Sequence, residues 1–145
     1  MKKAGSQFGF TLLELIVVIG LVALAAAVTV AALNSARNNG RDAAIKTSLA
    51  NIRQHAESDH LDFGSYDSVC GINGVDRSEA IADLLATAVS ESPSEAICAS
   101  EALPETQEWA ISVELAGGGY WCVDRSGFSG QILAPLDHSN DISCQ

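Results

Sequence analysis

The sequence predicts an α+β protein in which a long N-terminal helix can span a membrane with its first half and pack on a small antiparallel sheet with its second half. Three observations support this fold class. No charged residue lies between Leu15 and Ala36, an apolar stripe at helical spacing follows, and apolar and polar residues alternate between glycine-rich turns near the C-terminus. The chain of 145 residues therefore combines two unlike parts.

Residues 10–33 form the predicted membrane-spanning part. As a helix these 24 residues would reach roughly 36 Å at about 1.5 Å per residue, slightly more than the hydrocarbon core of a bilayer. They explain how a chain with a net charge of −10 has a mean hydropathy of +0.19. The acidic groups lie almost entirely outside this segment, where they favour solubility and argue against nucleic acid as a general partner.

Three interpretations of the N-terminal segment are open from its composition. A secretory signal peptide would begin with Lys2 and Lys3 and be cleaved after Ala27, at the end of a run of three alanines. A plain membrane anchor would remain uncleaved. Neither explains Glu14, the acid in the apolar region, because a carboxylate in hydrocarbon costs roughly 2.5–3.5 kcal/mol. Glu14 is therefore a functional candidate whose partner has to be identified.

The third interpretation rests on the string Gly9-Phe10-Thr11-Leu12-Leu13-Glu14, which resembles the processing site of type IV prepilins and pseudopilins. The resemblance covers Lys2 to about Leu33. It implies that residues 1–9 are a leader peptide, that a prepilin peptidase cuts between Gly9 and Phe10, and that the new amine of Phe10 is methylated. It also implies that the carboxylate of Glu14 offsets the N-terminal amine of a neighbouring subunit.

The resemblance implies a structural role. The chain would cross the inner (cytoplasmic) membrane once with its C-terminal part outside, be extracted by an assembly platform and its ATPase, and polymerise with copies of itself into an extracellular pilus. The nearest alternative is a pseudopilin of a type II secretion or DNA-uptake (competence) system, and the alternative from another class is a secreted or anchored binding domain. We expect no cofactor and no enzyme, since no nucleophile has a base at a recognisable spacing.

Residues 34–60 are predicted to form the amphipathic second half of the helix, ending near His60. Many pilins have a proline within this helix, whereas this chain has none before Pro93, so we expect a largely continuous helix with fraying near Asn38 to Gly40. The buried stripe of the second half consists of Ala44, Ile45, Leu49, Ile52 and Ala56.

Residues 61–145 are predicted to form a globular head. A loop over residues 63–71 precedes a short helix that Ser78 caps and that breaks at residues 90–95, with a further break at Leu103-Pro104. Alternation from residue 108 to 115 predicts a half-buried strand, and glycine turns lead to strands at 120–123 and 131–133. We expect a meander with a single helix over one face. The apolar face of the short helix carries Ile81, Leu84, Leu85, Ala88 and Val89.

Four cysteines, Cys70, Cys98, Cys122 and Cys144, all follow the membrane segment. Their separations of 28, 24 and 22 residues fit no zinc-ligand pair. Two disulfides are the expectation outside a membrane, and three pairings are open. We favour Cys70 with Cys98, around the short helix, and Cys122 with Cys144, which would tie the C-terminal loop to a strand.

Two sets of residues are conceivable metal ligands. His55 and His60 lie near acids at the end of the long helix, and His138 lies alone in the tail. Asp124, Asp137 and Asp141 could form a calcium loop similar to that of some major pseudopilins. We predict no metal site, because solvated side chains and a disulfide already account for these residues.

Overall fold

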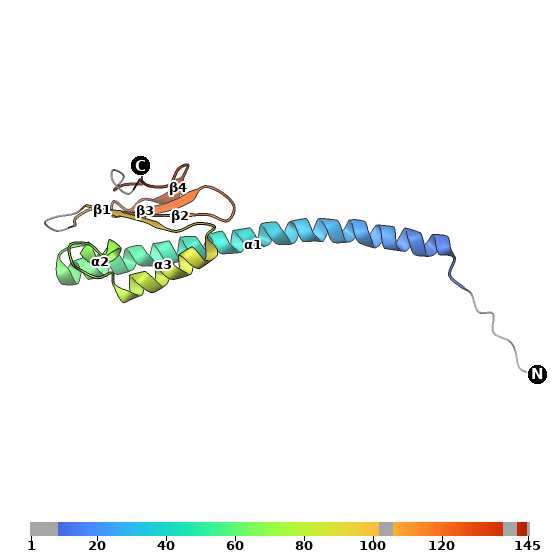
Figure 1. The fold of residues 1–145 in the computed structure, drawn as a ribbon, viewed down its shortest axis with the longest axis horizontal. Coiled ribbons are helices and arrows are strands. Elements are labelled where there is room, and N and C mark those ends of the chain that lie inside the picture. The colour runs from blue at the N-terminus through green and yellow to red at the C-terminus, as the bar shows by residue number, and fades with distance from the viewer. Residues whose placement is uncertain (1–8, 102–105, 138–141, 145) are drawn as a thin grey trace, which may run out of the picture. The chain divides into compact units, whose positions relative to one another are not determined.

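The computed structural model describes residues 9–101, 106–137 and 142–144. Its chain divides between Ala36 and Arg37 into two compact units. Figure 1 labels the seven elements, which are α1 (Leu12–Phe63), α2 (Asp67–Cys70), α3 (Glu79–Glu91), β1 (Ile97–Ser100), β2 (Trp109–Glu114), β3 (Tyr120–Asp124) and β4 (Ser129–Ile132). The first unit contains the apolar part of α1, and the second contains the remainder of α1 and all later elements.

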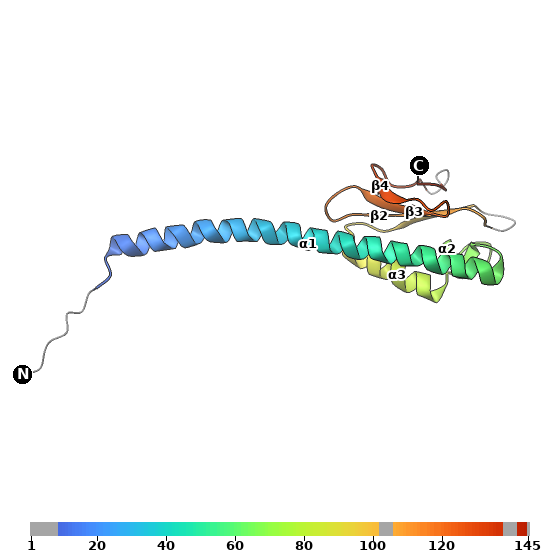
Figure 2. The ribbon, with the colours of Figure 1, turned by 180° about the vertical axis from the view of Figure 1, so that it is seen from behind.

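Helix α1 includes residues 38–40, so the segment where fraying was expected does not interrupt it (Figure 2). The helix ends at Phe63, three residues beyond the predicted end at His60. Gly64 provides the stop, because its φ of 79° is left-handed and its N–H donates to the carbonyl of His60 at 2.8 Å. The long N-terminal helix of the predicted α+β fold is therefore present.

The sheet has four antiparallel strands in the order β1-β2-β3-β4, which is a meander. The three predicted strands correspond to β2, β3 and β4, with boundaries shifted by one or two residues. The sequence analysis missed β1, which pairs Ile97 with Ser112 and Ser100 with Trp109. It also missed α2, a single turn inside the segment that was expected to be a loop. Both elements have four residues, too few to show a period.

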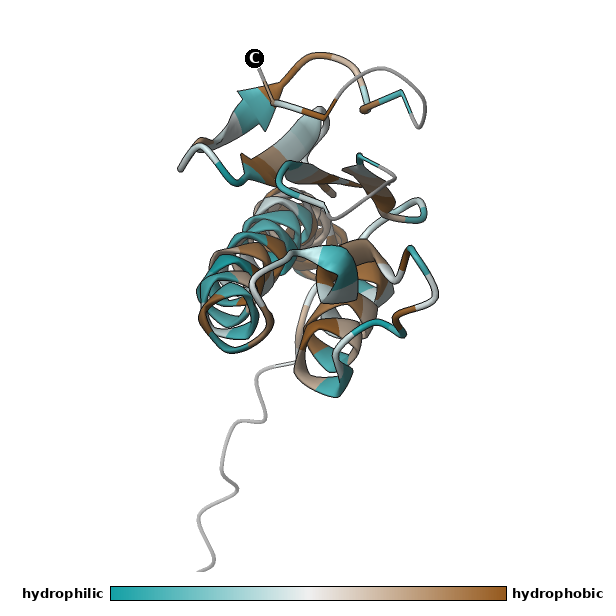
Figure 3. Ribbon diagram, turned by 90° about the vertical axis from the view of Figure 1, so that its left-hand side faces the viewer, coloured by the Kyte–Doolittle hydropathy of each residue, from teal (hydrophilic) through white to brown (hydrophobic). Residues whose placement is uncertain are grey.

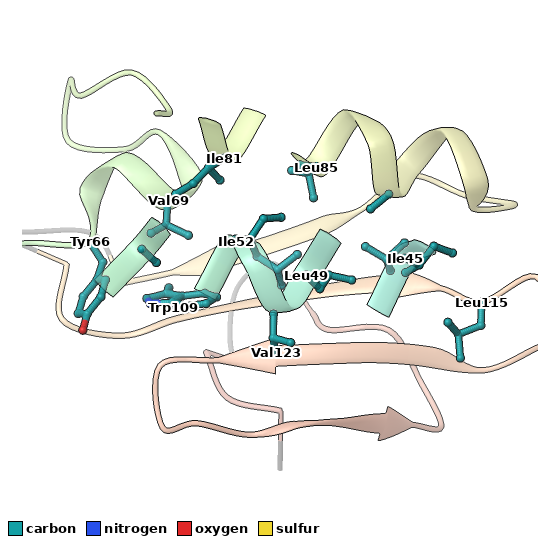
Figure 4. Packing of buried hydrophobic residues seen from close by; sticks show 14 residues of the cluster. Ile45, Leu49, Ile52, Tyr66, Val69, Ile81, Leu85, Trp109, Leu115 and Val123 are labelled. Carbon is teal, nitrogen blue, oxygen red and sulfur yellow. The ribbon is translucent and has the colours of Figure 1, made fainter. Parts of the chain in front are cut away.

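The larger core lies between the helices of the second unit and one face of the sheet. A single helix was expected on this side of the sheet, but α2 and α3 join the second half of α1 there (Figure 3). Four residues of the predicted α1 stripe are fully buried, and Figure 4 shows how such side chains converge. The core includes Ile45, Leu49, Ile52, Ala56, Val69, Ile81, Leu85, Trp109, Ile111, Val113 and Val123.

A second, smaller core covers the opposite face of the sheet, so the prediction that β2 is half-buried is wrong. Ala110 and Ser112, expected to face water, are buried. Ala110 packs in one cluster with Leu136 and Cys144 of the C-terminal segment, and Ser112 bonds to the same segment. The Ser112 Oγ accepts a hydrogen bond from the Leu136 N–H at 3.2 Å. The covering segment is distant in sequence, so the alternation in β2 contains no sign of it.

Asp67, at the first position of α2, is a buried carboxylate that joins two loops of the second unit. Its Oδ1 accepts hydrogen bonds from the Thr106 backbone N–H at 3.0 Å and the Asn73 side chain at 2.8 Å, and its Oδ2 accepts one from Ser65 at 3.0 Å. The bonds from Thr106 lower the pKa of Asp67 and outweigh burial, which raises it. The ionised form is therefore the one that the fold stabilises.

We expect Asp67→Asn to lower the free energy of unfolding at pH 7 by about 1–3 kcal/mol, because hydrogen bonds to a charged acceptor are replaced by weaker ones. The pKa of Asp67 is lower in the folded protein than in the unfolded chain, where it is near 4. The ionised carboxylate therefore stabilises the fold fully above about pH 4, and this contribution disappears as the pH falls through the folded-state pKa. The deficit of the variant should therefore shrink below about pH 4. Urea unfolding of the full chain in detergent at several pH values measures this, with exposed Asp83→Asn as the control. A deficit independent of pH would contradict the assignment.

Candidate functional site

The residues at the start of α1 form a capping box. The Thr11 Oγ1 accepts a hydrogen bond from the Glu14 N–H at 3.2 Å, while the Glu14 Oε2 accepts one from the Thr11 N–H at 3.3 Å and another from the Thr11 hydroxyl at 3.1 Å. Thr11 directly precedes the helix and Glu14 is its third residue, the positions that this motif requires. Glu14 thus has an intramolecular partner.

The sequence analysis missed this partner, although the spacing Thr-x-x-Glu before an apolar run is a known sign of a helix start. The expectation that a plain anchor does not explain Glu14 is therefore wrong, because any helix that begins at Leu12 benefits from the cap. Capping alone does not require an acid, since glutamine serves at the same position. The charge of Glu14, rather than its presence, is what still needs an explanation.

The bond between Gly9 and Phe10 lies outside the helix. Both residues are exposed and have no regular secondary structure, and α1 begins two residues after Phe10. The side chain of Phe10 is 82% exposed. An accessible, non-helical backbone can enter a peptidase active site, so this position is open to cleavage sterically.

The apolar half of α1 has no cover within its own unit. Its large side chains from Leu12 to Leu33 are 50% or more exposed, and the helix is long and apolar enough to cross a membrane. Its threonine at position 29 is compatible with such surroundings, because the Thr29 hydroxyl donates to the Ala26 carbonyl at 2.8 Å. A surface of this kind needs either lipid or other helices around it.

The cysteines form two disulfides, Cys70–Cys98 and Cys122–Cys144, with S–S distances of 1.96 and 2.05 Å. These are the pairs that the sequence analysis favours. The first links α2 to β1, and the second links β3 to the C-terminal segment that covers the sheet. The second unit therefore has a covalent tie on each face of its sheet.

Asp124 organises the end of β3. Its Oδ1 accepts hydrogen bonds from the Ser126 hydroxyl at 2.6 Å and the Phe128 N–H at 3.1 Å, and its Oδ2 accepts one from the Cys144 N–H at 2.9 Å. The residue is 1% exposed. Three protein donors therefore surround the carboxylate that the sequence analysis considered for a calcium loop. Asp141 and His138, also considered there, lie outside the described residues.

The two histidines of α1 have different surroundings. His55 is exposed, whereas the His60 ring stacks on the Tyr66 ring with centroids 4.2 Å apart. The Tyr66 hydroxyl donates to the Glu57 carboxylate at 3.1 Å, and burial raises the pKa of Tyr66. Within residues 9–101, 106–137 and 142–144, no group of three or more acidic, histidine or cysteine side chains is placed to hold a metal ion.

Comparison with known proteins adds no relative: no protein-family model, curated protein or solved structure matches this chain.

We expect Asp124→Ala to lower the free energy of unfolding by about 2–4 kcal/mol, because it leaves the part-buried N–H of Phe128 and the buried N–H of Cys144 without their acceptor. The C-terminal segment should also become more sensitive to proteolysis while the Cys122–Cys144 disulfide stays intact. Urea unfolding and limited proteolysis of the full chain in detergent measure both effects. Asp62→Ala, at an exposed acid, is the control; equal effects of the two variants would contradict the assigned role.

Proposed function

We propose that this protein is a structural subunit of a type IV pilus, cleaved after Gly9, methylated at Phe10 and polymerised into a helical filament. One observation carries the proposal: Glu14, the single acid in the apolar half of α1, follows an exposed and non-helical Gly9-Phe10 bond by four residues. Cleavage there would leave 136 residues and place a positive amine one residue before the capping box. It would also remove Lys2 and Lys3, changing the side-chain charge from −10 to −12.

The hydrogen bonds of Glu14 leave capacity for a partner from another subunit. Both bonds from Thr11 go to Oε2, and within the described part of the chain Oε1 has no donor. An ammonium group close to that oxygen in an apolar setting would be attracted far more strongly than in water, and each charge alone would be costly there. The cap would hold the carboxylate in a fixed position while Oε1 accepts the amine of the neighbouring subunit.

The exposed apolar helix supplies the rest of the proposed filament core. Gly20 has no atom within 4 Å of the position that a Cβ would occupy, and alanines are frequent from residue 23 to 32. Small residues let helices approach closely without lipid between them. An amine at the start of one helix and an acid further along the next make a head-to-tail contact, which generates a helical filament when the rotation does not close.

The intact mass of the protein isolated from cells tests processing. We expect residues 10–145 plus one methyl group, because cleavage and methylation occur at the same residue in the proposed pathway. A chain that begins at Val28 would indicate a secreted domain, and one that retains Met1 would indicate a plain anchor. Either result contradicts the proposal. Replacing Gly9 by a bulky residue should leave the full-length precursor in the membrane.

Glu14→Gln separates charge pairing from capping. Glutamine preserves the acceptor of the capping box and removes the charge, so we expect normal membrane insertion and helix content but a loss of filaments of at least about tenfold. Thr11→Ala is the matched variant: it removes the hydroxyl of the cap, retains the acid and should reduce assembly much less. Filaments sheared from cells and seen by electron microscopy provide the measurement. Normal filaments with Glu14→Gln would reduce Glu14 to a capping residue.

A further inference from the structure

The second unit contains an open groove at the C-terminal end of α1. It has a volume of about 460 Å³ and lies between the end of α1, the segment that includes α2, and the loop before α3. Phe63 and Val75 form its apolar part and are 76% and 45% exposed. Asp59 and Asp76 add two carboxylates. We call this feature the acidic groove.

The charges of the acidic groove are not neutralised within their own unit. The Asp59 Oδ2 accepts a hydrogen bond from the Ser68 hydroxyl at 2.9 Å, and in the described ranges neither Asp59 nor Asp76 forms an ion pair. Two carboxylates beside apolar walls attract a cation more strongly than the same charges on an open, fully hydrated surface. An occupant with a positive charge therefore fits the groove.

Five of the six lysine and arginine residues in the described segments already have partners. Arg41 and Arg125 form ion pairs with Glu91 and Glu108 at 3.3 and 2.8 Å. Arg53 donates to the Gly127 carbonyl, and the Lys46 ammonium lies over the Trp121 ring. Arg77 donates to the carbonyls of Val69 and Cys70, and burial lowers its pKa. Arg37 is exposed and has no partner among the described residues. It is therefore the cation that the chain has available for another molecule.

We propose that the acidic groove of one copy receives Arg37 of a second copy, an inference that rests on the proposed function. Both Arg37 and Asp59 belong to α1, 22 residues apart, which corresponds to roughly 33 Å along a helix. A second copy shifted by about that distance along the helix axis brings its Arg37 level with the groove. Such a contact joins two different surfaces, so it can repeat along a filament.

The net charge explains what this contact would contribute. Subunits with a strongly negative charge repel one another when their second units lie side by side. A cation that meets the carboxylates of the next copy reduces this repulsion at one register and leaves it intact at others. The contact would therefore favour one axial shift between neighbouring copies and would also stabilise their association.

Charge reversal tests the contact in cells that assemble the protein. Arg37→Glu and Asp76→Arg should each reduce the yield of sheared filaments by at least about tenfold. The double variant should restore most of the yield, because it reverses the pair. Arg37→Lys, which keeps the charge, and Asp83→Arg, which reverses an exposed acid outside the groove, are the controls and should assemble normally.

Processing and folding are checked in the same samples by intact mass and by protease resistance with the disulfides oxidised. Absence of filaments from the unaltered protein contradicts the proposed function itself. Filaments from the unaltered protein and from both single reversals overturn only the contact. Reduced assembly by both reversals without recovery in the double variant also overturns it, and indicates that the groove and Arg37 meet other partners.

Discussion

The uncovered apolar surface of α1 from Leu12 to Leu33 is the constraint from which the organisation of this chain follows. A helix that is apolar on all sides is stable in lipid or among other helices, and water excludes it from solution. The chain covers none of this surface within the unit that contains it. The remaining residues must therefore build a core without it, in about a hundred residues. Two disulfides and two separate apolar clusters meet that requirement.

Buried carboxylates determine how the loops of the second unit close. Asp67 and Asp124 each accept three hydrogen bonds, and in both cases one donor is a backbone N–H that lies at least 20 residues further along the chain. A carboxylate with this arrangement satisfies N–H groups that strands cannot satisfy. In Asp124 it also places Cys144 beside β3, so polar and covalent ties act on the same segment.

Local patterns predicted the elements that have enough residues to show a period. The stripe from Ile45 to Ala56 and the alternation from Trp109 to Leu115 identified part of the larger core, and the positions of the cysteines around the short helix and in the C-terminal tail favoured the observed pairing. The short elements α2 and β1 left no such pattern. The cover over Ala110 and Ser112 depends on residues more than 20 positions away, which no local alternation can reveal. The partner of Glu14 was local, and the motif that shows it was overlooked.

Capping and the proposed charge pairing at Glu14 are compatible because they use different oxygen atoms. The helix start occupies Oε2 and restricts the direction of the side chain, which would otherwise move among several rotamers. Binding to an ordered acceptor loses less conformational entropy than binding to a mobile one. A capping box at the start of an apolar helix therefore does more than begin the helix. In the proposed filament it would also hold a charged oxygen, Oε1, ready for the amine of a neighbouring subunit.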